Sequence, residues 1–228
     1  MSLSGLGGFL YQEKRNVILC DFDGTITVQD TAEWILDRHA KGDWRELDDD
    51  YVHGKISLLD CMRQQFALVS AKRPIILEEL DEEIDIRDGF TDFAGLCLAN
   101  GAKIVIVSAG IDFVIEHFLR RLGIEKKVSI YSASTYDEDG HLAFRFPPLL
   151  MPDSKTFKDD AVLQWKRDGY HVIYFGDGMP DTEACAISDH RFAVRCRRLE
   201  SELAKRGLPF MSFVDFRDVI PHMKAILE

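Results

Sequence analysis

The sequence predicts an α/β protein with a doubly wound parallel sheet and a small inserted helical cap domain. Three observations predict this architecture. Short apolar runs of strand length alternate with amphipathic helical segments, four successive helical segments interrupt the alternation near its start, and three apolar runs end in polar turns. Parallel strands need long crossover connections, which the helices supply. We therefore expect a core formed by residues 1–29 and 88–228 and a cap domain formed by residues 30–87.

The first predicted strand is the branched apolar run of residues 17–20, whose length and composition are typical of a buried strand. It is followed by Asp21 and Asp23, which point the same way in an extended chain because side chains i and i+2 share a face. Gly24 then allows a sharp turn. Two carboxylates held this close repel each other unless a cation lies between them or one is protonated. The end of this strand is therefore a candidate functional site.

The inserted segment contains four predicted helices. Apolar residues recur at helical spacing over residues 31–40, 44–52, 57–69 and about 74–84. Asp30 and Ser57 stand where helix N-caps are expected, and Pro74 suits the first turn of a helix. Because no strand pattern occurs here, the segment is interpreted as a cap, with hinges near residues 27–30 and 87–89.

After residue 88 the strand–helix alternation resumes, which predicts a Rossmann-like core. The expected strands are residues 103–107, 128–132, 171–175 and 191–194, and the expected helices are residues 90–100, 112–122, 159–168, 181–187 and 215–227. Residues 134–146 contain an acidic turn from Asp137 to Gly140 and predict a hairpin.

The composition excludes several classes of protein. With 46% hydrophobic and 29% charged residues the 228-residue chain is typical of globular proteins, and its net charge of −11 offers no basic stripe for nucleic acid. Five scattered cysteines without a CxxC pair favour reduced thiols and a cytoplasmic location over a disulfide framework. No apolar run approaches the ~18 residues of a membrane helix, and the first fifteen residues do not resemble a secretory signal, so no membrane partner is expected.

Acidic residues follow two of the predicted strands. Asp21 and Asp23 follow the first, and Asp177 follows residues 171–175, four positions before Asp181. Ligand sites of open parallel sheets lie beyond the carboxyl ends of the strands, so these carboxylates are expected to meet. An all-oxygen set of this kind suits Mg²⁺ (magnesium). Asp181, taken alone, is better explained as a helix cap.

A hydroxyl and a cation complete the predicted site. Ser108 ends the strand of residues 103–107, and Ala109 and Gly110 then form a turn at a helix N-terminus, where backbone N–H groups bind phosphate or an oxyanion. Lys155 and Lys158 are the two candidate cations before the helix of residues 159–168. An acceptor carboxylate, a metal, a hydroxyl and a lysine together describe phosphoryl transfer.

The order Asp-Phe-Asp-Gly-Thr, a serine at a strand end, a lysine, and Gly-Asp-x-x-x-Asp resembles the haloacid dehalogenase superfamily of phosphatases, from about residue 17 onward. The resemblance implies that Asp21 is a nucleophile that forms an aspartyl-phosphate and that Asp23 is the general acid and base. An acid at this second position is typical of phosphomonoester hydrolysis. Ser108 and Lys158 resemble the second and third motifs, and Lys158 is preferred over Lys155 because it directly precedes the predicted helix.

The resemblance also implies a metal site and a substrate site. Asp177 resembles the metal-binding aspartate, with Asp21 and the Asp23 main-chain carbonyl as further ligands, and Asp181 would support the metal or orient the lysine. The predicted activity is Mg²⁺-dependent hydrolysis of a small phosphorylated metabolite. Besides Ala109 and Gly110, the candidate substrate-binding residues are Asp30 and Arg63.

The position of the insert resembles a subfamily with small helical caps, which contains phosphoserine phosphatases and phosphatases of methionine salvage. Asp30 with Thr31, and the segments 54–57 and 86–90, are more similar to the salvage branch. That branch's cysteine-containing stretch before the lysine is absent here. Phosphoserine phosphatases need a cap arginine, for which Arg63 is the candidate, and Arg87 is expected to hold the hinge.

Two other classes of protein are alternatives to a hydrolase. A phospho-accepting signalling receiver also has an acidic pocket, but its acceptor lies later in the chain and it has no helical insert. A non-hydrolytic phosphate-binding protein is disfavoured because both Asp21 and Asp23 are present. The expected assembly is a monomer or a homodimer.

Overall fold

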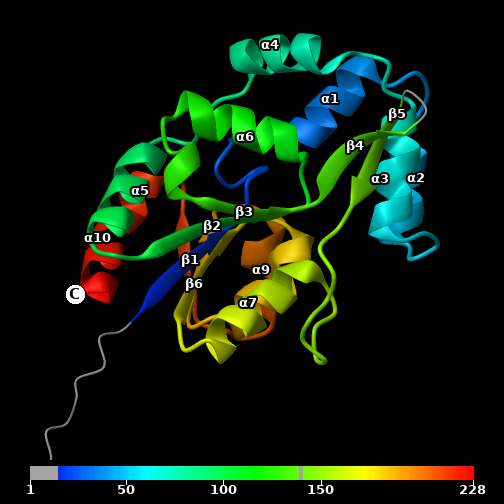
Figure 1. The fold of residues 1–228 in the computed structure, drawn as a ribbon. Helices are drawn as coiled ribbons and strands as arrows, with labels where there is room; N and C mark the ends of the chain where they lie inside the picture. The colour runs from blue at the N-terminus through cyan, green and yellow to red at the C-terminus, as the bar shows by residue number, and fades with distance from the viewer. Residues whose placement is uncertain (1–14, 139–140) are drawn as a thin grey trace, which may run out of the picture.

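A six-stranded parallel sheet forms the centre of the molecule in the computed structural model, which describes residues 15–138 and 141–228 (Figure 1). The strand order is β3-β2-β1-β6-β7-β8. The chain order reverses between β1 and β6, which makes this a topological switch point. The strands are β1 (Asn16–Cys20), β2 (Lys103–Ser108), β3 (Ser129–Ser132), β6 (His171–Gly176), β7 (His190–Val194) and β8 (Met211–Phe213). The predicted doubly wound sheet is confirmed.

Both faces of the sheet are covered by helices (Figure 1). Ile18 and Cys20 of β1 belong to one buried cluster, and Val17 and Leu19 to the other, because neighbouring strand residues point to opposite faces. Burial on both sides explains the uninterrupted apolar runs in the sequence. The first cluster includes residues of α5 (Phe90–Ala99), α6 (Asp112–Arg121) and α10 (Phe216–Leu227), and the second residues of α7 (Phe157–Arg167), α8 (Thr182–Ile187) and α9 (Arg198–Lys205).

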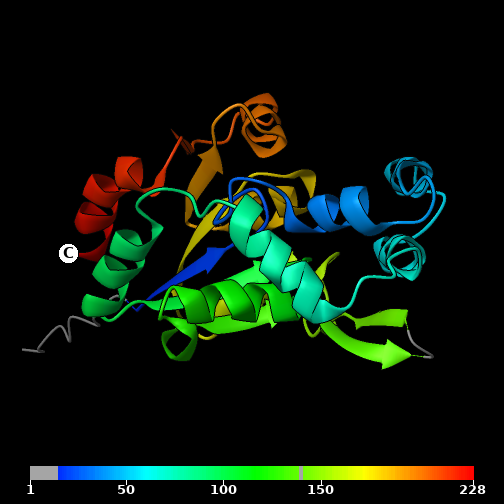
Figure 2. The same cartoon turned by 90° about the horizontal axis from the view of Figure 1, so that it is seen from above.

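Four helices follow β1 and lie beyond the sheet, as predicted (Figures 1 and 2). They are α1 (Thr31–His39), α2 (Arg45–Val52), α3 (Leu58–Ala67) and α4 (Arg73–Glu83). Both predicted caps are confirmed: the Asp30 carboxylate accepts from the Glu33 N–H at 2.9 Å, and the Ser57 hydroxyl accepts from the Asp60 N–H at 3.1 Å. Because Asp30 begins α1, the first cap helix starts directly beside the end of β1.

The predicted hairpin consists of β4 (Ser134–Glu138) and β5 (His141–Arg145), while Asp139 and Gly140 of its turn lie outside the described residues. Its second strand packs against α3, where the rings of Phe66 and Phe144 are 5.2 Å apart (Figure 2). We therefore propose that the cap comprises residues 30–87 together with this hairpin. Residues 1–14 of the expected core also lie outside the described residues.

The start of α7 differs from the prediction. The helix begins at Phe157, not at residue 159, because Thr156 and Asp159 form a capping box in which the Thr156 N–H donates to the Asp159 carboxylate at 2.7 Å. Lys158 therefore lies within the first helical turn. The predicted helix of residues 181–187 begins with a 3-10 turn, η2 (Met179–Asp181), and a second such turn, η1 (Glu125–Lys127), was not predicted. Nor were α9 and β8.

The two linkers between core and cap lie side by side. Thr27 and Ile86 form an isolated antiparallel bridge. Arg87 is buried beside them, and its guanidinium donates to the carbonyls of Gly24 at 2.6 Å and Thr25 at 2.8 Å. This geometry agrees with the expected role of Arg87 in holding the linker, while the hinges themselves stay predictions. Among the described helices, none has the length and apolar character to cross a membrane.

Candidate active site

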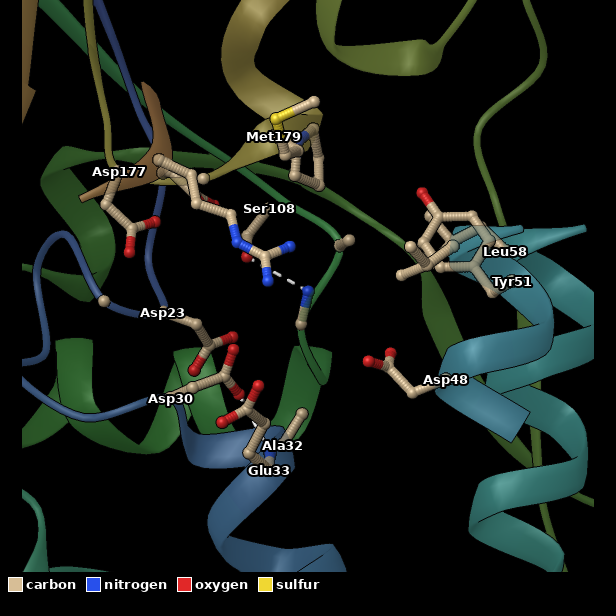
Figure 3. A pocket seen from close by; sticks show the side chains of 18 of the residues that line it. Asp23, Asp30, Ala32, Glu33, Asp48, Tyr51, Leu58, Ser108, Asp177 and Met179 are labelled. Atoms are coloured by element: carbon tan, nitrogen blue, oxygen red, sulfur yellow. Dashed lines mark hydrogen bonds between the residues drawn. The ribbon is translucent and has the colours of Figure 1, made fainter. Parts of the chain in front are cut away.

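A cavity of about 900 Å³ lies between the carboxyl ends of the central strands and the cap (Figure 3). Its floor includes Asp21 and Asp23 after β1, Ser108 at the end of β2 and Asp177 after β6, together with Lys158 from α7. The cap contributes a largely apolar wall, which includes Leu36, Trp44, Tyr51, Val52, Leu58, Met62 and Phe66. The polar residues that were predicted to meet at this edge of the sheet therefore lie together around one cavity.

Lys158 lies at the centre of the floor and is almost fully buried. Its Nζ is 2.9 Å from Asp21 Oδ1 and 2.7 Å from Asp181 Oδ1. Burial alone lowers the pKa of an ammonium group, but the carboxylates of Asp181 and Asp21 raise the pKa of Lys158 above its usual range. Lys155 is exposed, with its Nζ 3.8 Å from Glu183 Oε2. Of the two candidate lysines, only Lys158 reaches the floor.

Asp181 is fully buried and accepts hydrogen bonds on both carboxylate oxygens. Oδ1 accepts from Lys158 Nζ and from the Tyr174 hydroxyl at 2.8 Å, and Oδ2 accepts from the N–H groups of Asp177 at 3.2 Å and Gly178 at 3.0 Å. Asp181 precedes α8 but makes no side-chain cap bond to it. Its contacts instead orient the lysine and fix the loop after β6, which is one of the two roles that the resemblance implied.

Asp23 is held by Thr31, the first residue of α1. Its Oδ1 accepts from the Thr31 N–H at 2.8 Å and from the Thr31 hydroxyl at 2.6 Å. Burial, together with the nearby carboxylate of Asp30, raises the pKa of Asp23 to about 7. A carboxyl group with this pKa can both give and take a proton near neutral pH. The contact with Thr31 was not predicted from the sequence.

The turn after β2 packs closely against Asp23. The Ser108 hydroxyl accepts from the Gly110 N–H at 3.0 Å. A Cβ atom on Gly110 would lie 2.2 Å from Asp23 Oδ2, so this position requires glycine. Among the described residues other than glycine, Cys196 alone has a positive φ, so the methyl group of Ala109 introduces no backbone strain. Both Ala109 and Gly110 line the cavity.

Three carboxylates could hold a cation. Asp21, Asp177 and Asp181 each offer an oxygen within 4.8 Å of the other two. Burial and the Asp181 carboxylate raise the pKa of Asp21 well above its usual range and that of Asp177 to about 7. A divalent cation would compensate this buried negative charge, and hard oxygen ligands suit Mg²⁺. Since Asp181 already accepts four hydrogen bonds, Asp21 and Asp177 are the better placed ligands.

Gly24 makes room for Asp177 beside Asp21. Its φ of 70° is in the left-handed region, and an added Cβ would lie 2.3 Å from Asp177 Oδ2. The Asp23 carboxylate is occupied by Thr31, so its main-chain carbonyl stays the expected ligand from that residue. The donor set therefore fits the expected metal.

The two candidate specificity residues, Asp30 and Arg63, differ in their position relative to the cavity. Asp30 lines the cavity while capping α1. Arg63 is exposed and does not line it, because α3 turns the face that carries Leu58, Met62 and Phe66 toward the cavity. Apart from Lys158, the basic residues that line the cavity are Arg197 and those of α9, a segment that carries no motif. Figure 3 shows Asp30 and Glu33 close to Asp23, and Asp48 on the opposite side of the cavity near Tyr51 and Leu58.

Comparisons with known proteins agree with this arrangement. The family model of haloacid dehalogenase-like hydrolases matches residues 18–185. The chain is 30% identical over 219 residues to a 2-hydroxy-3-keto-5-methylthiopentenyl-1-phosphate phosphatase of Bacillus velezensis, covering 92% of both chains. It is 28% identical over 225 residues to Pdp3-interacting factor 1 of Schizosaccharomyces pombe, covering 91% of this chain and 94% of that protein.

A similar fold occurs in a solved structure described as a phospho-aspartyl intermediate analogue of phosphoserine phosphatase. The TM-score is 0.68, the sequence identity is 18%, and the match covers 92% of this chain and 99% of that one. At this identity the likeness establishes the fold.

Proposed function

Because the chain is a phosphatase that belongs to the haloacid dehalogenase-like hydrolase family, we propose that it hydrolyses the phosphomonoester of a small metabolite with the aid of Mg²⁺. One observation carries the proposal. The Asp21 carboxylate lies 2.9 Å from the buried Lys158 ammonium on the floor of the cavity, and Asp23 follows two residues later. A nucleophile, a fixed cation and a proton donor thus face one space large enough for a metabolite.

The proposed reaction has two steps. A carboxylate oxygen of Asp21 attacks phosphorus, and the bond between phosphorus and the ester oxygen breaks while the Asp23 carboxyl gives that oxygen its proton. A water molecule then attacks the aspartyl-phosphate, and the Asp23 carboxylate takes a proton from it, so that phosphate leaves and Asp21 is restored. The hydrogen bonds from Thr31 hold Asp23 for both transfers.

The other floor residues stabilise charge during this reaction. The Lys158 ammonium and the Ser108 hydroxyl face the space where the phosphoryl oxygens would lie, and Asp181 positions the lysine. Mg²⁺ bound by Asp21, Asp177 and the Asp23 main-chain carbonyl would supply Lewis-acid neutralisation of phosphoryl charge. The cap excludes bulk water from the floor.

The relatives indicate which esters to try first. Several are named as phosphatases of a methylthiopentenyl phosphate. The apolar cap wall, with Leu58, Met62 and Phe66, suits an apolar chain of that kind. Phosphoserine is the alternative substrate, for which Arg63 is no longer an obvious partner. The cytoplasmic location and the state of monomer or homodimer stay predictions.

The test is phosphate release from a panel of small phosphomonoesters that includes both candidates. We expect turnover that needs Mg²⁺, that stops on chelation, and that is lost in the Asp21→Asn variant but kept in Asp153→Asn, a change at an exposed carboxylate. A phosphoprotein that accumulates and persists without release of phosphate would contradict the hydrolase and support a receiver.

A further inference from the structure

One side of the cavity is formed by a charged helix face. The residues of α9 that line the cavity are Arg198, Ser201, Glu202 and Lys205, while its leucines are buried in the core. These four positions share one face because residues three or four apart are neighbours on a helix. Figure 3 shows Asp177 and Met179 on one side of the cavity and Tyr51 and Leu58 on the other. The charged face of α9 therefore lies across the cavity from a cap side that carries apolar residues together with the carboxylate of Asp48.

Arg197 and Arg198, on the core side, have N–H donors available for a ligand, whereas the lysines of the cavity are paired. Lys158 is paired with Asp21 and Asp181, and Lys205 Nζ is 2.7 Å from Glu202 Oε1. Arg197 donates once to the Val28 carbonyl at 3.2 Å, and its Nε is 3.9 Å from Asp177 Oδ2.

Among residues 15–138 and 141–228, the Arg198 side chain has no hydrogen-bond or ion-pair partner. Each guanidinium carries five N–H donors, so most of those on Arg197 and Arg198 are uncommitted.

Hydrogen bonds fix the backbone around these two arginines. Cys196, between Arg195 and Arg197, has a φ of 60°, which costs free energy for a residue with a Cβ atom. The Cys196 N–H donates to Glu200 Oε2 at 2.6 Å, and the Leu199 N–H donates to the Asp177 carbonyl at 2.8 Å. The strained turn is therefore tied directly to the loop that carries the candidate metal ligand.

We propose that Arg197 and Arg198 bind a planar pair of oxygen acceptors on the leaving group of the ester. This inference rests on the proposed phosphatase function. The guanidinium fork matches two coplanar oxygens, as in a carboxylate or in a hydroxyl group beside a ketone. The cavity of about 900 Å³ is far larger than a phosphoryl group, and Lys158 already serves the floor. The pair thus selects oxygen-rich leaving groups, while the opposite wall receives apolar atoms.

The experiment compares three esters of similar size: 3-phosphoglycerate with a carboxylate, dihydroxyacetone phosphate with a hydroxy-ketone, and propyl phosphate with neither. We expect the wild type to prefer one of the first two over propyl phosphate by at least about 10-fold in kcat/KM. The double variant Arg197→Gln, Arg198→Gln should reduce this preference to below about 3-fold and leave propyl phosphate hydrolysis within about 3-fold. Lysine at both positions should restore only part of the preference, because it lacks the fork.

Arg195→Gln is the matched control, since Arg195 is exposed in the same loop and does not line the cavity; its preference should equal that of the wild type. A preferred carboxylate or a preferred hydroxy-ketone identifies which acceptor pair is recognised. Equal losses for all three esters in the double variant would overturn the proposal and assign the arginines to the transferred phosphoryl group. An unchanged preference would overturn it as well.

Failure of the proposed function is distinguishable from failure of this inference. If the wild type releases phosphate from none of the esters, the phosphatase reaction fails as a whole. The arginines are then tested by calorimetric titration of the same esters into Asp21→Asn, with and without the two glutamine substitutions. Tighter binding of an acceptor-bearing ester that depends on the arginines supports the proposal, and equal affinities overturn it.

Discussion

The floor of the cavity and its cap wall differ in how their side chains are held. On the floor, Asp181 accepts four hydrogen bonds and Lys158 contacts two carboxylates. On the wall, Leu58 and Met62 pack through apolar contacts, which have no preferred direction, and Val52 is 59% exposed. Hydrogen bonds are directional and hold the floor side chains in one arrangement, whereas apolar contacts let the wall side chains repack. We therefore expect the floor to determine the reaction and the walls to determine the choice of substrate.

Substitution of Asp23 should have the largest effect on the floor. We expect Asp23→Asn to lower kcat/KM, which reports the steps up to formation of the aspartyl-phosphate, by about 10²- to 10⁴-fold for esters with alcohol leaving groups, because the departing oxygen loses its proton donor. The loss should be smaller for p-nitrophenyl phosphate, whose leaving group needs little protonation. Steady-state kinetics on both kinds of ester measure the difference. An equal loss on both would mean that Asp23 acts on the phosphoryl group and not on the leaving oxygen.

Asp160 is a buried carboxylate outside the cavity and serves as a reference for the floor. It accepts from the N–H groups of Leu150 at 2.8 Å and Met151 at 2.7 Å and from the Ser154 hydroxyl at 2.9 Å. Burial alone raises the pKa of Asp160, but these donors and Gln164 bring it below its usual value. On the floor, Asp21, Asp23 and Asp177 have fewer donors than Asp160, and burial raises their pKa values.

We expect Asp160→Asn to destabilise the protein by about 1–3 kcal/mol at pH 7. Because the pKa is lower in the folded state, the ionised carboxylate stabilises the fold above the unfolded-state pKa of about 4, and this contribution is lost as the pH falls through the folded-state pKa. Urea unfolding of wild type and variant from pH 7 downward should therefore give curves that converge in acid. A constant difference at every pH would contradict the assignment.

Thr31 connects the two regions, since it belongs to the cap and holds a floor residue. Thr31→Val removes the hydroxyl donor to Asp23 and leaves the backbone N–H, so we expect kcat to fall about 10-fold with little change in the free energy of unfolding. Thr31→Ser, which keeps the hydroxyl, should restore most of the rate. If the serine variant is as slow as the valine variant, the side-chain hydrogen bond does not explain the effect.

The smallest effect is expected on the cap wall. Leu58→Ala should raise KM for the preferred ester about 5-fold and leave kcat within 2-fold, because the half-buried side chain contributes apolar contact and no chemistry. Leu59→Ala is the control, as Leu59 is also half-buried but does not line the cavity. A fall in kcat with unchanged KM for Leu58→Ala would mean that Leu58 acts on the reaction, as the floor residues do, and not on substrate binding.

The same contrast explains what the sequence could predict. Burial on both faces forces β1, β2 and β6 to be continuous apolar runs, so Asp21, Ser108 and Asp177 stand out where those runs end. The order of these elements along the chain was enough to place them at one sheet edge. The four cap helices were predictable from apolar spacing and from the caps at Asp30 and Ser57.

Contacts between distant elements were not predictable. Tyr174 lies within a buried apolar strand and looks like a core aromatic, yet its hydroxyl donates to Asp181. Leu199 and Leu203, four residues apart, were an available signal for α9. The direction in which the Arg197 side chain points depends on the backbone of Cys196. No residue pattern in the sequence predicts the positive φ of Cys196. Arg63 was a candidate because phosphoserine phosphatases need a cap arginine, but its side chain lies about 100° around α3 from Met62.

The most direct test of the central claim is to trap the phosphoryl group on the protein. Asp23→Asn should still accept phosphate from an ester with a good leaving group but should hydrolyse the aspartyl-phosphate slowly, because the water lacks its base. Acid quenching and peptide mass spectrometry after mixing with p-nitrophenyl phosphate and Mg²⁺ would locate the group. The account predicts one phosphoryl group on the peptide that contains Asp21, and none when Asp21→Asn is added to the variant. A phosphoryl group on any other residue, or phosphate release without a phosphorylated protein, would contradict it.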